Sequence, residues 1–271
     1  MIDCGEGTQL QCKRYNVKLS KIDHILISHL HGDHYYGLIG LLSTMHLYGR
    51  QKVLTLAGPP GLKEILSLQL RYSETRLNFA IDFTEWTPNT IQMVLNTDRF
   101  FVETIPLDHR VPCSGYLIKE KPNRRRIDRE KIAQQLPPNY LHQLKDGKDV
   151  YDESGKLLYS ASEVTKPPLK HLSYAYCSDT RYKPSLKTQL DQVDLIYHEA
   201  TFAEDMEDRA HDTYHTTAKQ AATLAKDLSA GQLMIGHFST RYKELDQLLA
   251  EAREIFPTTS LATEGQTFNA K

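Results

Sequence analysis

The chain has 271 residues, 40% of them hydrophobic, which is enough for one large domain or two modest ones with a buried core. A formal net charge of −1 excludes a generally cationic nucleic-acid-binding surface, so any such contact requires a local basic patch. Because the sequence has neither a long apolar run nor a signal peptide at MIDCGEGTQL, we expect no membrane span and a cytoplasmic location. The 4 cysteines are scattered without CxxC spacing, so the sequence indicates neither a thiolate zinc knuckle nor a disulfide framework.

Predicted strands and helices alternate along the chain, which indicates a layered α/β fold. Apolar and β-branched runs predict strands, and apolar residues at helical spacing predict helices after several of them. Thr216 or Thr217 is suited to cap one of these helices. The predicted strands are residues 24–28, 53–56, 100–105, 173–177, 193–197 and 233–235, and the predicted helices run through residues 35–47, 62–70, 221–228 and 245–255.

The stretch between about 118 and 170 has a different composition from the rest. It contains EKPNRRRIDREK, QQLPPNY and KDGKDVYDESGK, which are rich in charge, proline and turn residues. We therefore predict an insertion or protruding arm here.

Several predicted strands end in a histidine or an aspartate, and strand ends on one edge of a sheet converge. Imidazole nitrogen and carboxylate oxygen are ligands that suit zinc, and 7 such residues exceed what one catalytic zinc takes. They fit two metals that share a carboxylate and acidify a bridging hydroxide as the nucleophile. We assign His29, His31 and His109 to one metal and Asp33, His34 and His237 to the other, with Asp179 between them.

Simpler interpretations exist for each part of this pattern. HLHGDH at 29–34 is alternatively a polar turn on a solvated surface, although three histidines and an aspartate in six residues have few structural uses. Taken singly, His109, Asp179 and His237 are alternatively ordinary capping or surface residues.

The sequence resembles the metallo-β-lactamase superfamily through HLHGDH, and one of its branches, the ribonuclease Z family of tRNA 3′-processing endonucleases, more closely. The matching segments follow one another along the whole chain: IDCGEGTQ, ISHLHGDHYYGL, PLDHRVPCSGY, YCSDTR, YHEATF, YHTT and IGHFSTRY. The resemblance implies an αββα sandwich, a homodimer, two zinc ions per chain and the seven metal ligands as assigned above.

The resemblance also implies catalytic roles. His215 is similar to the family's catalytic histidine, a general acid for the leaving 3′ oxygen, and Glu199 would orient it. Asp33 would bind metal and position the hydroxide, whereas Asp3 matches a buried aspartate for which a structural role is equally compatible. Without the resemblance, His215 is alternatively a neighbour of a helix N-cap and Glu199 an ordinary charge at a strand end.

The densest basic run lies at the start of the predicted arm. In ribonuclease Z enzymes this place carries a flexible arm that clamps tRNA, so the resemblance implies RNA binding here, through phosphate and 2′-hydroxyl contacts. The alternative is a solvated charged face. The residues of the run are Lys121, Arg124, Arg125, Arg126, Arg129 and Lys131.

The family normally has several dozen residues before IDCGEGTQ. The resemblance therefore implies that residues 1–271 are a single, N-terminally incomplete metallo-β-lactamase domain with an exposed sheet edge. The expected activity is zinc-dependent removal of 3′ trailers from precursor tRNA by attack of a metal-bound hydroxide, leaving a tRNA 3′-hydroxyl and a 5′-phosphorylated trailer. The alternatives are a phosphodiesterase of the same superfamily acting on a small substrate, and a catalytically impaired RNA-binding homologue.

Overall fold

A computed structural model of the chain describes residues 1–132 and 135–270, so Ala133 and Gln134 of the predicted insertion, and Lys271, lie outside the described residues. The chain divides into two compact units. The first comprises Met1–Lys119 with Ser173–Lys271, and the second comprises Glu120–Leu172. Within the described ranges, no helix has the length and apolarity needed to cross a membrane.

The N-terminal part of the first unit contains a three-stranded parallel sheet in the order β1-β2-β3. Ile25 and Leu56 are buried in a cluster with residues of helices α3 and α4, whereas Leu26 and Ala57 belong to a second cluster on the other face. This alternation follows from the two-residue period of a strand. The elements are α1 (Thr8–Arg14), β1 (His24–Leu26), α2 (Gly32–Tyr35), α3 (Leu38–Leu47), β2 (Leu54–Gly58), α4 (Leu62–Tyr72) and β3 (Ile81–Glu85).

A seven-stranded mixed sheet forms the other half of the first unit, in the order β14-β13-β12-β11-β6-β5-β4. Strands β11 to β14 run parallel, and β6 pairs antiparallel with β11. These strands are β4 (Met93–Asn96), β5 (Phe100–Pro106), β6 (Ser114–Glu120), β11 (Ser173–Cys177), β12 (Leu195–Glu199), β13 (Gln232–Gly236) and β14 (Thr259–Leu261). The helices that follow β11 are α7 (Lys187–Leu190), α8 (Glu207–Thr213), α9 (Ala218–Asp227) and α10 (Asp246–Ile255).

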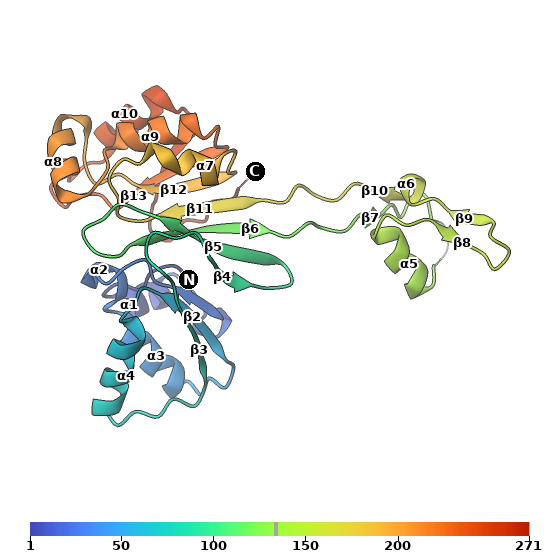
Figure 1. Cartoon of the computed structure of the whole chain (residues 1–271), viewed down its shortest axis with the longest axis horizontal. Coiled ribbons are helices and arrows are strands. Elements are labelled where there is room, and N and C mark those ends of the chain that lie inside the picture. The colour runs from blue at the N-terminus through green and yellow to red at the C-terminus, as the bar shows by residue number, and fades with distance from the viewer. Residues whose placement is uncertain (133–134, 271) are drawn as a thin grey trace. The chain divides into compact units, whose positions relative to one another are not determined.

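The two sheets of the first unit face each other, with helices outside both. Figure 1 shows α3 and α4 beside β2 and β3, and α9 and α10 beside β12 and β13. Between the sheets, the buried Trp86 donates from Nε1 to the hydroxyl of Tyr116 at 3.0 Å, and that hydroxyl donates to the carbonyl of Ile27 at 2.6 Å. The layers are therefore helix, sheet, sheet and helix, and Tyr116 links the second sheet to the segment that leads to His29.

The second unit has its own small core. Strand β7 (Arg126–Ile127) pairs antiparallel with β10 (Thr165–Lys166), and β8 (Val150–Tyr151) pairs with β9 (Leu157–Tyr159). Helices α5 (Pro138–Lys145) and α6 (Ala161–Val164) complete it. The buried residues Leu136, Leu144, Val150, Ala161 and Val164 form one cluster. The unit covers nearly the range of the predicted insertion, and its role as an arm stays a prediction.

The secondary structure differs from the sequence prediction in places that have physical reasons. The predicted helix 35–47 is interrupted between α2 and α3, where Gly37 donates to the carbonyl of Cys4 at 2.9 Å. A Cβ at Gly37 would lie 2.1 Å from the carbonyl oxygen of Gly5, so the close approach of the two segments requires glycine. Strands β3, β4 and β14 and helices α1 and α8 were not predicted, because they are short and have weak apolar periodicity.

Candidate metal centre

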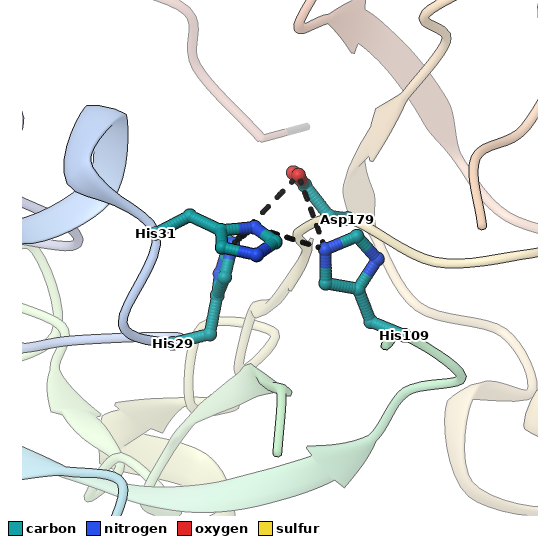
Figure 2. Close-up of side chains that lie close together, drawn as sticks. All are labelled: His29, His31, His109 and Asp179. Atoms are coloured by element: carbon teal, nitrogen blue, oxygen red, sulfur yellow. Dashed lines mark hydrogen bonds and ion pairs between the residues drawn. The ribbon is translucent and has the colours of Figure 1, made fainter. Parts of the chain in front are cut away.

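Four side chains from three segments meet in a first cluster, which we call the first subsite: His29, His31, His109 and Asp179 (Figure 2). His31 Nδ1 lies 3.1 Å from His29 Nε2 and 3.2 Å from His109 Nε2. Asp179 Oδ2 lies 3.8 Å from His29 Nε2 and 3.9 Å from His109 Nε2. One donor atom from each residue, all within 4.8 Å of one another, is the spacing that a single ion requires.

A second cluster, the second subsite, consists of Asp33, His34 and His237. Asp33 Oδ2 lies 3.4 Å from His34 Nε2 and 3.5 Å from His237 Nε2. Asp179 turns its other oxygen here, with Oδ1 3.4 Å from His34 Nε2 and 3.3 Å from His237 Nε2. Asp179 thus faces both subsites with different oxygens, as predicted for a shared carboxylate, and all seven predicted ligands come together.

The electrostatics of the two subsites differ. Burial lowers the pKa of His109 to about 4, and burial with the nearby His34 also lowers the pKa of His29. Burial opposes protonation of His237, yet its hydrogen bond to Asp33 raises the pKa of His237 to about 9. The first subsite therefore offers neutral imidazoles, the form that ligates metals, and the second attracts positive charge.

Hydrogen bonds behind the histidines leave the ring atoms that face the clusters free for an ion. His34 Nδ1 donates to Asp3 Oδ2 at 2.8 Å, and His109 Nδ1 donates to the carbonyl of Tyr214 at 3.1 Å. His34 Nε2 and Asp179 Oδ1 are buried and have no hydrogen-bond partner among the described residues. Burying these two polar atoms 3.4 Å apart without a hydrogen-bond partner costs free energy unless a cation binds between them. The residues present therefore fit a metal.

The Asp3 carboxylate accepts several of the hydrogen bonds behind the two subsites. Besides His34, it accepts from the Ser28 amide at 2.7 Å and the Ser28 hydroxyl at 2.9 Å. The Ser28 hydroxyl lies 3.0 Å from His29 Nδ1, so Asp3 acts on one histidine of each subsite. Asp3, for which a structural role was one of the possibilities left open by the sequence, thus orients two ligand candidates.

Glu199, His215 and Thr201 form a third group beside the second subsite. His215 Nδ1 donates to Glu199 Oε1 at 3.0 Å, so the two residues that the resemblance pairs lie in contact. Burial would raise the pKa of Glu199, but its bond with His215 holds that pKa below the ordinary value. The Thr201 hydroxyl lies 2.8 Å from Glu199 Oε2 and 3.0 Å from His237 Nδ1. Thr201 was not predicted as a site residue, although it lies in the YHEATF segment, two residues after Glu199.

The predicted RNA-binding residues lie in the second unit, where they differ in what they contact. Arg125 donates from Nε to the Thr165 hydroxyl at 2.6 Å, so it stabilises the unit itself. Arg124 forms an ion pair with Asp146 at 3.1 Å. The most exposed cations of the run are Arg124, Arg126, Arg129 and Lys131, whereas Lys121 and Arg125 are half-buried.

Known proteins are similar in sequence to this chain over nearly its full length. The ribonuclease Z of Cytophaga hutchinsonii is 50% identical over 268 residues, which cover 99% of this chain and 86% of that protein. The ribonuclease Z of Bacteroides fragilis is 44% identical over 265 residues, 97% of this chain and 87% of that protein. The chain belongs to the ribonuclease Z family.

Solved structures show the same fold. The short form of human tRNase Z superposes with a TM-score of 0.70 at 23% identity, covering 100% of this chain and 87% of that structure. The metallo-β-lactamase fold protein YhfI from Bacillus subtilis gives 0.65 at 19% identity, covering 98% and 85%. The profile of the family described as "Anti-Pycsar protein Apyc1" matches residues 1–121. Two predictions are thereby confirmed. The chain has the metallo-β-lactamase fold, and it is a metal-dependent endoribonuclease of the ribonuclease Z family.

Proposed function

We propose that this ribonuclease Z family member binds two zinc ions and removes 3′ trailers from precursor tRNA, leaving a 3′-hydroxyl on the tRNA. The observation that carries the proposal is the pair of donor clusters that Asp179 faces with its two oxygens. His29, His31 and His109 would hold one ion, and Asp33, His34 and His237 the other. When bound, the ions supply an acidified water as nucleophile and neutralise negative charge on the phosphodiester.

The chain's own residues would supply orientation and proton transfer. The Asp33 side chain is 67% exposed, so it lies where it can accept a hydrogen bond from the attacking water. The buried Glu199 carboxylate accepts from His215 Nδ1 and so fixes the orientation of the ring. His215 would then donate its Nε2 proton to the departing 3′ oxygen, which is the role of a general acid.

Recognition of the tRNA body is assigned to the second unit. The exposed guanidinium groups of Arg126 and Arg129 are suited to phosphate contacts, which carry most of the affinity and little sequence information. Lys121, Arg124 and Arg125 belong to the same proposed surface, although Arg125 also holds Thr165.

We also propose a homodimer. Leu10 on α1, with 74% of its surface exposed, and Leu47 and Tyr48 at the end of α3, with 79% and 78%, support an apolar contact surface on the first unit. Sedimentation equilibrium measures this directly, and a monomer at micromolar concentration contradicts it.

The test of activity is cleavage of a trailer-bearing precursor tRNA by the purified protein with zinc, with the 3′ end of the product mapped. Cleavage after the discriminator nucleotide is expected, and Asp179→Asn should lose at least a thousandfold in rate because both subsites lose a ligand charge. His211→Ala is the matched control, since this histidine is 69% exposed and belongs to neither subsite. A folded, zinc-loaded protein that makes no cut at that junction would refute the proposal.

The same assay separates the alternative of a small-substrate phosphodiesterase. Removing the charges of Arg126 and Arg129 should weaken cleavage of precursor tRNA and leave hydrolysis of bis(p-nitrophenyl) phosphate unchanged. Equal loss on both substrates would point away from RNA recognition by the second unit.

A further inference from the structure

Tyr214 has an unusual backbone conformation immediately before His215. It follows α8 with φ 63° and ψ 44°, in the left-handed region. A side chain with a Cβ costs about 1–2 kcal/mol there, and large side chains are rare in it. Strain of this kind persists only where surrounding contacts stabilise it, and it is concentrated at functional sites.

This conformation directs two groups of the segment into the metal centre. The Tyr214 carbonyl accepts from His109 Nδ1 at 3.1 Å, which leaves His109 Nε2 facing the first subsite. The next residue, His215, has its amide bonded to the Ala210 carbonyl at 2.8 Å and its ring bonded to Glu199. A change of φ at Tyr214 would turn that carbonyl and displace the His215 ring together.

Arg181 contacts Tyr214 and the end of α8, where backbone bonds from the Tyr214 amide to the His211 carbonyl and from the His215 amide to the Ala210 carbonyl also support this conformation. Its guanidinium carbon lies 3.5 Å from the centre of the Tyr214 ring, and its Nε donates to the His211 carbonyl at 2.7 Å. Its amide donates to the Asp108 carbonyl at 2.9 Å, next to His109. Arg181 therefore holds both the segment before Tyr214 and the segment that carries His109.

A second arginine–tyrosine pair shows what an incidental stack looks like in this chain. The Arg71 guanidinium lies 5.1 Å from the ring of Tyr72, which is 80% exposed on α4. Exposed stacks of this kind contribute about 0.5–1 kcal/mol and fix nothing else. Arg181 differs because its guanidinium lies closer to the ring and because it also forms hydrogen bonds with the His211 and Asp108 carbonyls.

We propose that Arg181 is a positioning residue that acts through Tyr214: the stack holds Tyr214 in the left-handed conformation, and Tyr214 in turn orients His109 for metal and His215 for the leaving group. The inference rests on the proposed metal centre. It assigns functional significance to Arg181 and Tyr214, which belong to neither subsite as defined above.

The test measures zinc affinity by competition with a chromophoric chelator, on the full chain. Arg181→Ala and Tyr214→Ala should each weaken zinc binding about tenfold or more, as loss of a group that orients a ligand does. Tyr214→Gly should recover part of the loss of Tyr214→Ala, because glycine adopts φ > 0 without strain. Adding Arg181→Ala to Tyr214→Gly should then weaken zinc binding less than Arg181→Ala does in the parent, since no ring is left to stack on and only the bond to the His211 carbonyl is lost.

Two further variants separate positioning from other roles. Arg181→Lys keeps the charge and loses the planar stack, so positioning predicts weakened zinc binding, whereas a direct phosphate contact predicts nearly normal binding of both zinc and RNA. Arg71→Ala is the matched control and should bind zinc as the parent does. Thermal melts in EDTA verify that each variant is folded.

Unchanged zinc affinity in a folded Arg181→Ala, or Tyr214→Gly no better than Tyr214→Ala, overturns the inference. If the parent binds zinc and cleaves precursor tRNA in that case, the proposed function survives. A parent that binds no zinc overturns the proposed function and this inference together.

Discussion

Replacing Thr201 with valine removes one hydroxyl and keeps the shape of the side chain. In the structure this hydroxyl lies between the Glu199 carboxylate, at 2.8 Å, and His237 Nδ1, at 3.0 Å. The carboxylate is the stronger acceptor, so it takes the hydroxyl proton, and the hydroxyl oxygen accepts from His237. Valine leaves His237 Nδ1 without a partner and removes the contact that fixes its ring towards the second subsite.

The expected loss of zinc affinity is about 10- to 100-fold, or about 1.4–2.7 kcal/mol. Because zinc stabilises the folded state in proportion to the logarithm of its affinity, a tenfold loss should lower the melting temperature of the zinc-loaded protein by about 3 °C. Chelator competition gives the affinity, and melts with zinc and with EDTA give the stability.

Two controls decide the interpretation of Thr201→Val. Thr201→Ser keeps the hydroxyl and should bind zinc within about threefold of the parent. Thr223→Val makes the same chemical change on α9, where the hydroxyl donates to the Lys219 carbonyl at 2.9 Å and lies outside both subsites, and should leave zinc affinity unchanged. If Thr201→Val binds zinc as tightly as Thr201→Ser, the hydroxyl does not orient His237 and the reasoning is refuted.

Three other predictions follow from features elsewhere in the chain. Burial raises the pKa of Cys4 to about 11 and of Cys177 to about 12, and it also raises those of Cys12 and Cys113, so the native protein at pH 8 should react with Ellman's reagent far more slowly than the denatured one. Rapid titration of all four thiols in the native state would contradict their burial. Tyr116→Phe should lower the free energy of unfolding by about 2 kcal/mol, because the buried Trp86 Nε1 loses its acceptor, and the fluorescence of this single tryptophan reports the transition. The exposed Tyr72→Phe is its control, and equal unfolding midpoints would argue against the bond. Arg126→Ala with Arg129→Ala should reduce the slope of log affinity for tRNA against log salt by about 2, measured by filter binding, and an unchanged slope would exclude phosphate contacts there.

The parts of the site that the sequence predicted are those carried by adjacent residues. HLHGDH follows a short apolar strand, so convergence of His29, His31, Asp33 and His34 follows from local geometry. His109, Asp179 and His237 were predicted because each follows a strand, and the parallel pairing of β11, β12 and β13 brings the last two to one edge of the sheet.

The groups behind the ligands could not be predicted in the same way. The bond from His109 to the Tyr214 carbonyl joins residues 105 positions apart and depends on one positive φ, for which tyrosine gives no sequence signal. The role of Thr201 also depends on His237, 36 positions away. The positions of backbone carbonyls and single hydroxyls in the site depend on the tertiary fold, so the sequence does not predict them. Closely spaced histidines and aspartates can be predicted because their spacing along the chain brings them together.

The pairing of β6 with β11 has a consequence for how this chain can change in evolution. Ser173 pairs with Lys119, so the two chain ends of the second unit are held side by side by an antiparallel ladder of the first. The first unit needs only a segment that connects the end of β6 to the start of β11. The entropic cost of closing such a loop rises slowly with the number of residues in it. The inserted segment is therefore free to lengthen, shorten or be exchanged for another module, while the register of the strands and the positions of the residues in the two subsites stay as they are.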